Sequence, residues 1–278
     1  MASTPVAAAS STSASSASST SPPSSASTQL TATTQFPFGD GFATRRPIAA
    51  GDIVIMFERF NVMTALTMTP GSVFQNRFGV FHHDDLIGKP FGCKVHSRRL
   101  GGGHMYGLAP TAELWSQALC TRTQIVFSSD AAVIALQLHL RAGSRMAEAG
   151  TGSGALSTAF ARIVGPTGHL FTFEFNENRA QLAQEEFAKN HLAHVVTAAW
   201  GDICKDGCGA ALEGTLDAIM LDLPNPWDAI PHAAAALRPG GRLCSFSPCI
   251  EQVQKSCVQL SERGFISTCS WVRGGRVG

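Results

Sequence analysis

The sequence lacks an excess of charge of either sign and lacks long apolar runs, and each absence removes a class of protein. Its 278 residues carry a formal net charge of +1. A protein that binds nucleic acid by electrostatics alone usually concentrates basic residues on one face. No run approaches the roughly 18 apolar residues of a membrane span. Nucleic acid therefore remains compatible with this chain where a partner subunit supplies positive charge.

Clustered cysteines and tyrosines are also lacking. The eight cysteines are scattered, and the one close pair, Cys204 and Cys208, has no second pair or nearby histidines at zinc spacing. We therefore expect reduced thiols and no metal site. The single tyrosine is Tyr106. A nicotinamide oxidoreductase is disfavoured, because the sequence offers no Tyr-Lys or histidine-based set for hydride transfer.

The first region of the chain, residues 1–46, is expected to be a disordered tail. Residues 1–35 are mostly Ser, Ala, Thr and Pro and carry no charged side chain. Such a segment buries too little apolar surface to offset the entropy lost on ordering. A Ser-rich, acid-poor composition is also typical of organelle transit peptides. We expect a nuclear location, and the N-terminal composition leaves organelle targeting open.

Two folded regions follow. Residues 47–110 alternate short apolar runs with turns, which predicts a small β domain of sandwich or barrel type. Residues 111–278 change to strands separated by helices, which predicts a doubly wound, mostly parallel, Rossmann-like α/β sheet. The expected strands are 144–149, 169–175, 194–200, 218–223, 242–246 and 265–272.

The expected helices lie at 130–140, 155–164, 177–191, 227–237 and 250–263. The first is expected to be capped by Ser129. Its apolar residues are predicted to face the core, namely Val133, Ile134, Leu136 and Leu140. The helix at 227–237 is expected to end at the turn 239–241.

A glycine-rich segment links the first expected strand to the helix at 155–164. Glycine allows positive φ and a close backbone approach to a ligand, and the amides that open a helix attract an anionic group. A dinucleotide fits through the relaxed fingerprint that ends at Ala155, S-adenosylmethionine fits equally well, and a turn without a cofactor also fits. The segment comprises Glu148, Ala149, Gly150, Thr151, Gly152, Ser153 and Gly154.

Three acids follow three further strands. Glu174 is placed to bind ribose hydroxyls, and Asp202 to accept from an adenine amine, although Gly-Asp is also a common turn. Asp222 ends an apolar strand and precedes Leu-Pro-Asn-Pro-Trp. That pattern is typical of a platform on which a carboxylate accepts from the amino group of a planar base. The alternative is that Asp222 caps the helix at 227–237. Ligands bind where the carboxyl ends of such strands meet, so we expect one site here.

Several blocks of the chain resemble the catalytic subunit of the eukaryotic tRNA (adenine-N1)-methyltransferases, which modify position 58 in the T-loop. The resemblance spans roughly residues 48–272. It implies a class I methyltransferase fold that uses S-adenosylmethionine without a metal. It also implies a heterotetramer with non-catalytic, tRNA-binding subunits, which would explain the near-neutral charge. The matching blocks are 85–92, 110–115, 122–125, 150–154, 221–227 and 246–254.

The resemblance also implies roles for individual residues. Asp222 matches the catalytic aspartate, which would accept from the N6 amino group of adenine. Glu174 matches the ribose-binding acid, and Asp202 with Ile203 the adenine-binding pair. The remaining matches lie near the cofactor, namely Thr123, Gln124, Ile125 and Arg179.

One departure and two alternatives remain. The antiparallel strand that this fold normally inserts between its fifth and sixth strands has no counterpart, because the sequence stops six residues after Val272. We expect either a fragment or a C-terminal end rebuilt by a partner. One alternative function is methyl transfer to another RNA or to a small molecule. The other is a non-catalytic tRNA-binding subunit, which the intact segment 148–154 and Asp222 disfavour.

Overall fold

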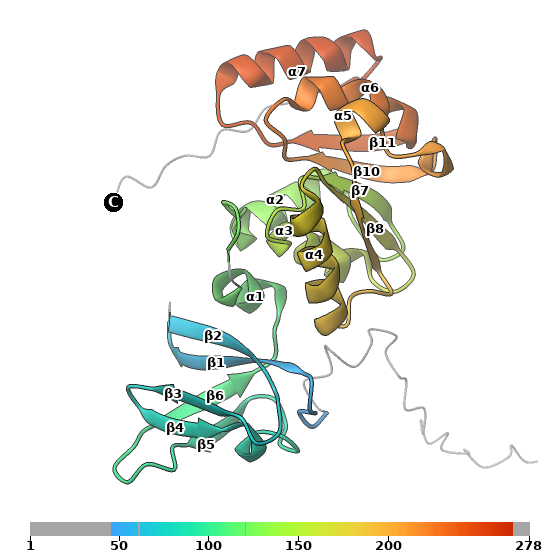
Figure 1. Cartoon of the computed structure of the whole chain (residues 1–278). Helices are drawn as coiled ribbons and strands as arrows, with labels where there is room; N and C mark the ends of the chain where they lie inside the picture. Colours follow the sequence, from blue (N-terminus) through green and yellow to red (C-terminus); the bar gives the residue numbers. More distant parts are fainter. Residues whose placement is uncertain (1–45, 61, 120, 269–278) are drawn as a thin grey trace, which may run out of the picture. The chain divides into compact units, whose positions relative to one another are not determined.

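The computed structural model describes residues 46–60, 62–119 and 121–268 (Figure 1). The tail predicted over 1–46 thus lies almost wholly outside the described residues. Contacts group the described residues into one compact unit, so the domain boundary at residue 110 stays a prediction. No helix in the described ranges is long and apolar enough to cross a bilayer.

The N-terminal part is antiparallel β structure, as the sequence predicts. Four strands pair in the order β2-β1-β6-β5, a hairpin joins β3 to β4, and Pro70–Gly71 lies in the turn between β2 and β3. Alternate residues of β1, such as Val54 and Met56, enter a core that also contains Phe81. The strands are β1 (Ile53–Arg59), β2 (Val62–Thr67), β3 (Val73–Asn76), β4 (Gly79–His82), β5 (Cys93–His96) and β6 (His104–Leu108).

A five-stranded sheet forms the second part, in the order β11-β10-β7-β8-β9, with every neighbouring pair parallel. This confirms the predicted doubly wound topology. The strand order reverses between β7 and β10, which is the switch point where such sheets bind ligands. The strands are β7 (Arg145–Ala149), β8 (His169–Glu174), β9 (Val196–Trp200), β10 (Leu216–Leu221) and β11 (Leu237–Ser245).

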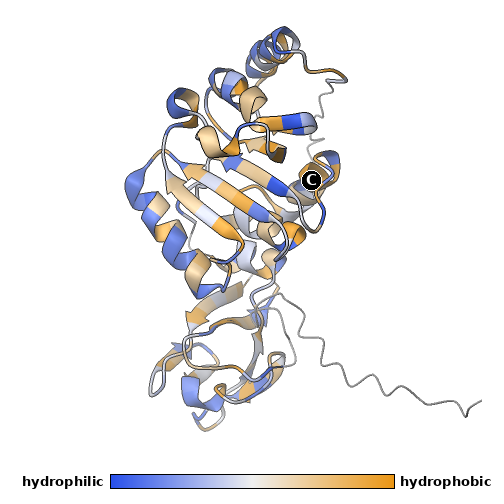
Figure 2. Cartoon of the chain, turned by 90° about the vertical axis from the view of Figure 1, so that its right-hand side faces the viewer, coloured by the Kyte–Doolittle hydropathy of each residue, from blue (hydrophilic) through white to orange (hydrophobic). Residues whose placement is uncertain are grey.

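Helices cover both faces of this sheet. Met220 packs with Phe160 and Phe187 on the face of α2, α3 and α4, whereas Ile219 packs with Ile230 on the face of α6. Because both faces are covered, β10 is buried at every residue except Asp217. Figure 2 shows apolar, orange stretches in the strands, interrupted by hydrophilic, blue ones. The helices are α1 (Ala112–Ala118), α2 (Ser128–Gln137), α3 (Ala155–Val164), α4 (Glu177–Lys189), α5 (Ile203–Asp206), α6 (Pro226–Ala236) and α7 (Ile250–Glu262).

The predicted buried face of α2 is right for Ile134 and Leu140, which pack in or against the core, and wrong for Val133 and Leu136, which are exposed. The helix begins at Ser128 after Phe127, which provides no side-chain cap, so Ser129 is not the capping residue. Leu136 is 70% exposed, whereas the buried residues are small or branched: Ala131, Ile134 and Ala135. The small alanine side chains allow α2 to pack closely against α3. The prediction from apolar periodicity considered only the larger apolar residues and therefore missed these alanines.

The predicted C-terminal elements also need correction. Residues 239–241 do not end a helix; they lie inside β11, where the pairing with β10 shifts register between Leu216 and Ala218. Pro239 and two glycines lie in this irregular part of β11. Since β11 is an edge strand, a proline is tolerated there. Residues 265–268 of the predicted sixth strand are not a strand, and residues 269–272 lie outside the described part.

A carboxyl group is buried between β7, β8 and α3. Glu148 is 1% exposed, and its Oε2 accepts hydrogen bonds from the hydroxyls of Ser157 and Thr172, the latter at 2.7 Å. Burial raises the pKa of Glu148 to about 7, and the nearby Asp222 and Glu174 add to this through charge repulsion. The acid that opens the glycine-rich segment is therefore part of the core.

The packing of α3 predicts a contrast between two apolar side chains. Phe160 is fully buried, so Phe160→Ala should lower the free energy of unfolding by about 3–5 kcal/mol, because it leaves a large cavity. Leu136→Ala is the matched control on α2 and should change it by less than about 0.5 kcal/mol. Urea unfolding measures both. Equal losses in the two variants would contradict the observed faces of these helices.

The pKa of Glu148 predicts a pH dependence of stability. Its folded-state pKa of about 7 exceeds the ordinary 4.5, so between these values the folded protein binds more protons than the unfolded chain. Stability therefore falls as pH rises from about 4.5 to 7. Glu148→Gln should remove this fall. The unfolding free energy of the variant, relative to that of the wild type, should therefore increase as pH rises across that range. The exposed Glu185→Gln on α4 is the control, and urea unfolding at pH 5 and pH 8 is the measurement. Parallel pH curves for Glu148→Gln and the wild type would contradict the assignment.

Candidate functional site

The glycine-rich segment has the backbone that only glycine adopts readily. The φ angles of Gly150, Gly152 and Gly154 are +98°, +54° and +74°. A Cβ atom on Gly150 would lie 2.2 Å from the carbonyl oxygen of Asp222, and one on Gly152 would lie 2.6 Å from Oγ1 of Thr123. The segment therefore forms a cradle without side chains, closed on two sides by neighbouring backbone and hydroxyl groups.

The switch point brings Asp222 beside this cradle. The amide of Asp222 donates to the carbonyl of Ala149 at 2.9 Å, and the amide of Gly150 donates to the carbonyl of Phe173 at 2.9 Å. These bonds join the carboxyl ends of β10, β7 and β8. The predicted convergence of Asp222 with the glycine-rich segment is therefore present in the structure.

The Asp222 carboxylate is half-buried and lacks a donor. No hydrogen bond to it comes from the part of the chain that the structure describes, and burial alone raises its pKa. It does not cap α6, because that helix begins at Pro226 after Asn225. The cap hypothesis is therefore wrong, and the carboxylate is available to a ligand.

Glu174 lies at the end of β8 and is 3% exposed. It accepts from the amide of Gly152 at 2.9 Å, from the amide of Asn176 at 3.0 Å and from Nε of Arg179 at 3.0 Å. The structure thus brings together Glu174, Arg179 and the glycine-rich segment. Arg179 is placed there through its ion pair with Glu174.

Asp202 and Ile203 follow β9 at the same edge of the sheet. Asp202 caps the short helix α5 by accepting from the amide of Cys204 at 3.1 Å, and Nζ of Lys205 lies 3.3 Å from its second oxygen. Ile203 is buried in the core beneath α6. The position of this pair is as predicted, and its contact with a cofactor stays a prediction.

The segment before α2 lies against the glycine-rich segment. The amide of Thr123 donates to Oγ of Ser153 at 3.0 Å, which brings Thr123 to the glycine-rich segment. Its contact with a cofactor stays a prediction. Ile125 packs against the apolar cluster around Trp115. Gln124 is exposed, and no hydrogen bond with another described residue brings it to the site.

Sequence reasoning missed Arg122 as a site residue. Its NH1 donates to Glu186 of α4 at 2.7 Å, its NH2 lies 3.4 Å from the carbonyl of Gly152, and its amide donates to Oγ of Ser153 at 2.8 Å. Arg122 thereby ties the glycine-rich segment to α4. The sequence signal that could have identified Arg122 is the block 122–125, in which it directly precedes the predicted residues Thr123, Gln124 and Ile125.

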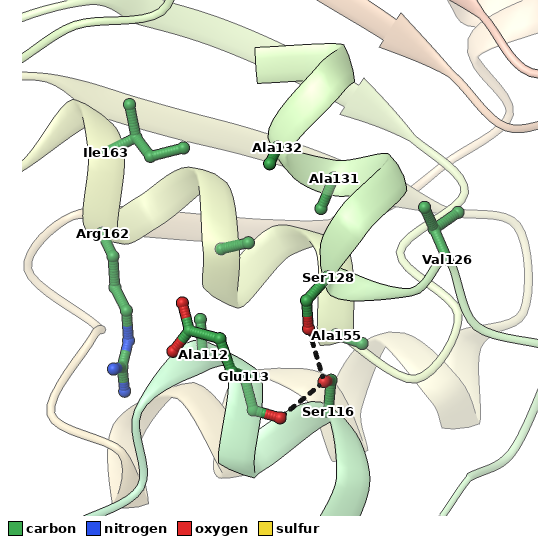
Figure 3. Close-up of a pocket in the computed structure, with 11 residues that line it drawn as sticks. Ala112, Glu113, Ser116, Val126, Ser128, Ala131, Ala132, Ala155, Arg162 and Ile163 are labelled. Atoms are coloured by element: carbon green, nitrogen blue, oxygen red, sulfur yellow. Dashed lines mark hydrogen bonds between the residues drawn. The ribbon is translucent and has the colours of Figure 1, made fainter. Parts of the chain in front are cut away.

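A separate cavity of about 240 Å³ lies between α1, α2 and α3 (Figure 3). Its polar lining includes Glu113, Ser116, Ser128 and Arg162, and the rest is mainly alanine. Burial lowers the pKa of Arg162 to about 9, and its guanidinium donates to the carbonyl of Pro110. None of the predicted cofactor-binding residues lines this cavity, so it is distinct from the site at the strand ends.

Two family comparisons cover most of the described chain. Residues 103–270 match the family described as "tRNA methyltransferase complex GCD14 subunit", and residues 47–95 match "TrmI-like N-terminal". The second match coincides with most of the N-terminal β structure.

Curated relatives are similar over most of this chain. The tRNA (adenine(58)-N(1))-methyltransferase catalytic subunit of Dictyostelium discoideum is 45% identical over 220 residues, which cover 78% of this chain and 70% of that protein. The subunit of the same name from Schizosaccharomyces pombe is 40% identical and is covered over 62% of its length, with 80% of this chain aligned. A relative from Cryptococcus neoformans is 43% identical over 226 residues, which cover 81% of this chain and 52% of that protein. The chain thus spans between about half and about two thirds of these relatives.

Solved structures show the same fold. An S-adenosylmethionine-dependent O-methyltransferase from Thermotoga maritima is 30% identical with a TM-score of 0.68, and the match covers 78% of this chain and 79% of that one. The tRNA (m1A58) methyltransferase TrmI from Aquifex aeolicus is 25% identical with a TM-score of 0.62, covering 78% and 82%. Together with the family match over residues 103–270, these findings show that the chain belongs to the GCD14 family of tRNA methyltransferase complex subunits.

Proposed function

We propose that this chain is a catalytic subunit that transfers a methyl group from S-adenosylmethionine to N1 of adenine 58 in the T-loop of tRNA. Relatives that are 40–45% identical carry that activity in their names. The observation on which the proposal rests is the Asp222 carboxylate, half-buried beside the glycine-rich segment without a hydrogen-bond donor among the described residues. A scaffold subunit would have no use for such a group.

The residues at the strand ends fit S-adenosylmethionine. The segment Gly150–Gly154 presents backbone where a Cβ would clash, and Glu174 and Asp202 supply acceptors at the ends of β8 and β9. We expect Glu174 to hold the ribose, Asp202 with Ile203 to hold the adenine, and Thr123 to border the segment. The cofactor, when bound, supplies an electrophilic methyl group, so the protein need only orient and desolvate the reactants.

Asp222 orients the target base in this mechanism. The ionised carboxylate accepts a hydrogen bond from the N6 amino group of adenine, which points N1 towards the methyl donor. As N1 is methylated the base becomes positively charged, and the nearby carboxylate stabilises that charge. Burial makes the interaction stronger than it would be in water. Because N1 faces its neighbours in folded RNA, the base must be drawn out of the RNA fold.

Partner and location belong to the same proposal. The formal net charge of +1 gives the chain little overall electrostatic attraction for tRNA. The family name refers to a complex, which supports a partner subunit. We propose that this partner is non-catalytic, supplies tRNA contacts and forms a heterotetramer with the chain. We further propose a nuclear location, and targeting of the N-terminal tail to an organelle is the alternative.

A second candidate is a methyltransferase for another RNA or for a small molecule. The Thermotoga relative, named an O-methyltransferase, favours it. The two candidates differ in substrate, because an O-methyltransferase modifies a hydroxyl group and has no need of an acceptor for a base amino group. A non-catalytic tRNA-binding role would instead leave Asp222 dispensable.

The substrate is tested with labelled S-adenosylmethionine. The chain, co-expressed with its partner subunit, should incorporate one methyl group per tRNA transcript that carries adenosine 58. A transcript with guanosine at that position is the control and should remain unlabelled. Label that is unaffected by the change of base would reject the proposed target.

The role of Asp222 gives a second test. Asp222→Asn should lower kcat by about 10²–10³-fold, because it removes the charge that stabilises the methylated base, while the cofactor Kd changes less than about threefold. The exposed Asp228→Asn is the matched control. Since burial raises the pKa of Asp222 above 3.8, wild-type kcat/KM should fall as pH drops through that raised value. Unchanged turnover in Asp222→Asn would reject the mechanism.

A further inference from the structure

The loop that follows Asp222 has few hydrogen bonds of its own. Pro224 and Pro226 have no amide hydrogen to donate. The backbone bond within the loop and the start of α6 is from the amide of Asp228 to the carbonyl of Asn225, at 3.2 Å. Both Pro224 and Asn225 are exposed. The position of this loop therefore depends on side chains from other elements.

Gln252 of α7 supplies such a contact. Its Nε2 donates to the carbonyl oxygen of Pro224 at 2.9 Å, two residues after Asp222. A carbonyl oxygen can only accept, so this bond fixes the orientation of the amide. Oε1 of Gln252 is buried and has no hydrogen-bond partner among the described residues. An unpaired buried acceptor costs stability, so a helix that served packing alone would favour an apolar residue here.

Lys255 makes a second contact one turn along the same face of α7. Its Nζ lies 4.6 Å from the centre of the Trp227 ring, in the first turn of α6. Residues three apart on a helix are neighbours on its surface. Gln252 and Lys255 thus hold the two ends of the stretch from Pro224 to Trp227.

The loop also contacts α5. Sγ of Cys204 lies 4.0 Å from the carbonyl oxygen of Asn225. Cys204 follows Asp202 and Ile203, the proposed adenine-binding pair. The loop therefore contacts both α5, the element next to the cofactor site, and α7. Within the described ranges, no hydrogen bond joins α7 to a proposed cofactor-binding residue.

From these contacts we propose that Gln252 is a positioning residue for Asp222. It sets the place of the Asp222 carboxylate against the target base by holding the carbonyl of Pro224. This inference rests on the proposed function, since it assigns Gln252 a role in the same methyl transfer. Misplacement of a reacting group by about 1 Å can cost about 10²-fold in rate.

The test compares two glutamines of α7 in the chain co-expressed with its partner. Gln252→Ala should lower kcat for tRNA methylation by about 10–100-fold, with the cofactor Kd and the KM for tRNA within threefold of wild type. Gln254→Ala is the matched control, because Gln254 is exposed on the same helix, and it should keep kcat within twofold. If Gln252→Ala lowers the yield of folded protein, Gln252→Met is used in its place, because methionine keeps the length of the side chain.

A double mutant separates positioning from a general loss of structure. In the Asp222→Asn background, Gln252→Ala should lower the residual single-turnover rate by less than twofold, because Gln252 acts through Asp222. A merely structural role would give the same fold-loss in both backgrounds. Equal fold-losses, or a Gln252→Ala enzyme as active as Gln254→Ala, would overturn the proposal.

Hydrogen exchange gives a measurement that does not depend on the substrate. In Gln252→Ala, the hydrogen-bonded amides of Asp222 and Asp228 should exchange at least threefold faster, while amides of residues 150–154 remain unchanged. Unchanged exchange at Asp222 and Asp228 would overturn the proposed contact. If the wild type methylates no tRNA but the loop responds as expected, the proposed function fails and the loop contact stands.

Discussion

The close approach of the β7 and β10 ends is the constraint on which the site depends. The amide of Asp222 binds the carbonyl of Ala149, and the carbonyl of Asp222 occupies the space that a Cβ on Gly150 would need. A larger residue at Gly150 would push β10 away from β7. The same contact therefore fixes the switch point of the sheet, opens the backbone cradle and places the Asp222 carboxylate beside it.

Three acids at this edge differ in what surrounds them. Glu148 is in the core and accepts from two hydroxyls, and Glu174 accepts from two amides and Arg179. Asp222 has none of these partners within the described ranges. Burial raises the pKa of both Glu148 and Asp222. Their surroundings thus distinguish a buried acid that accepts from two hydroxyls, an acid held in place by its donors and an acid left available for a base.

Local patterns predicted much of the fold and of the site. The strand β10 is an apolar run apart from Asp217, and Gly150 requires a positive φ that the sequence signals directly. Other features failed because they depend on neighbours. The buried face of α2 includes alanines that pack in the core beside α3, and residues 239–241 lie in an irregular part of β11, between the pairs Leu216–Leu237 and Ala218–Arg242.

The sequence by itself determined the order of strands and helices, the glycine-rich segment and the acids after each strand, because these depend on residue type and spacing along the chain. Tertiary structure alone decided that Asp222 is not a helix cap, that Arg179 pairs with Glu174 and that Gln252 reaches the carbonyl of Pro224. The last of these joins residues 28 positions apart. No local pattern encodes such a contact, since it exists only after β10, β11 and α7 have packed together.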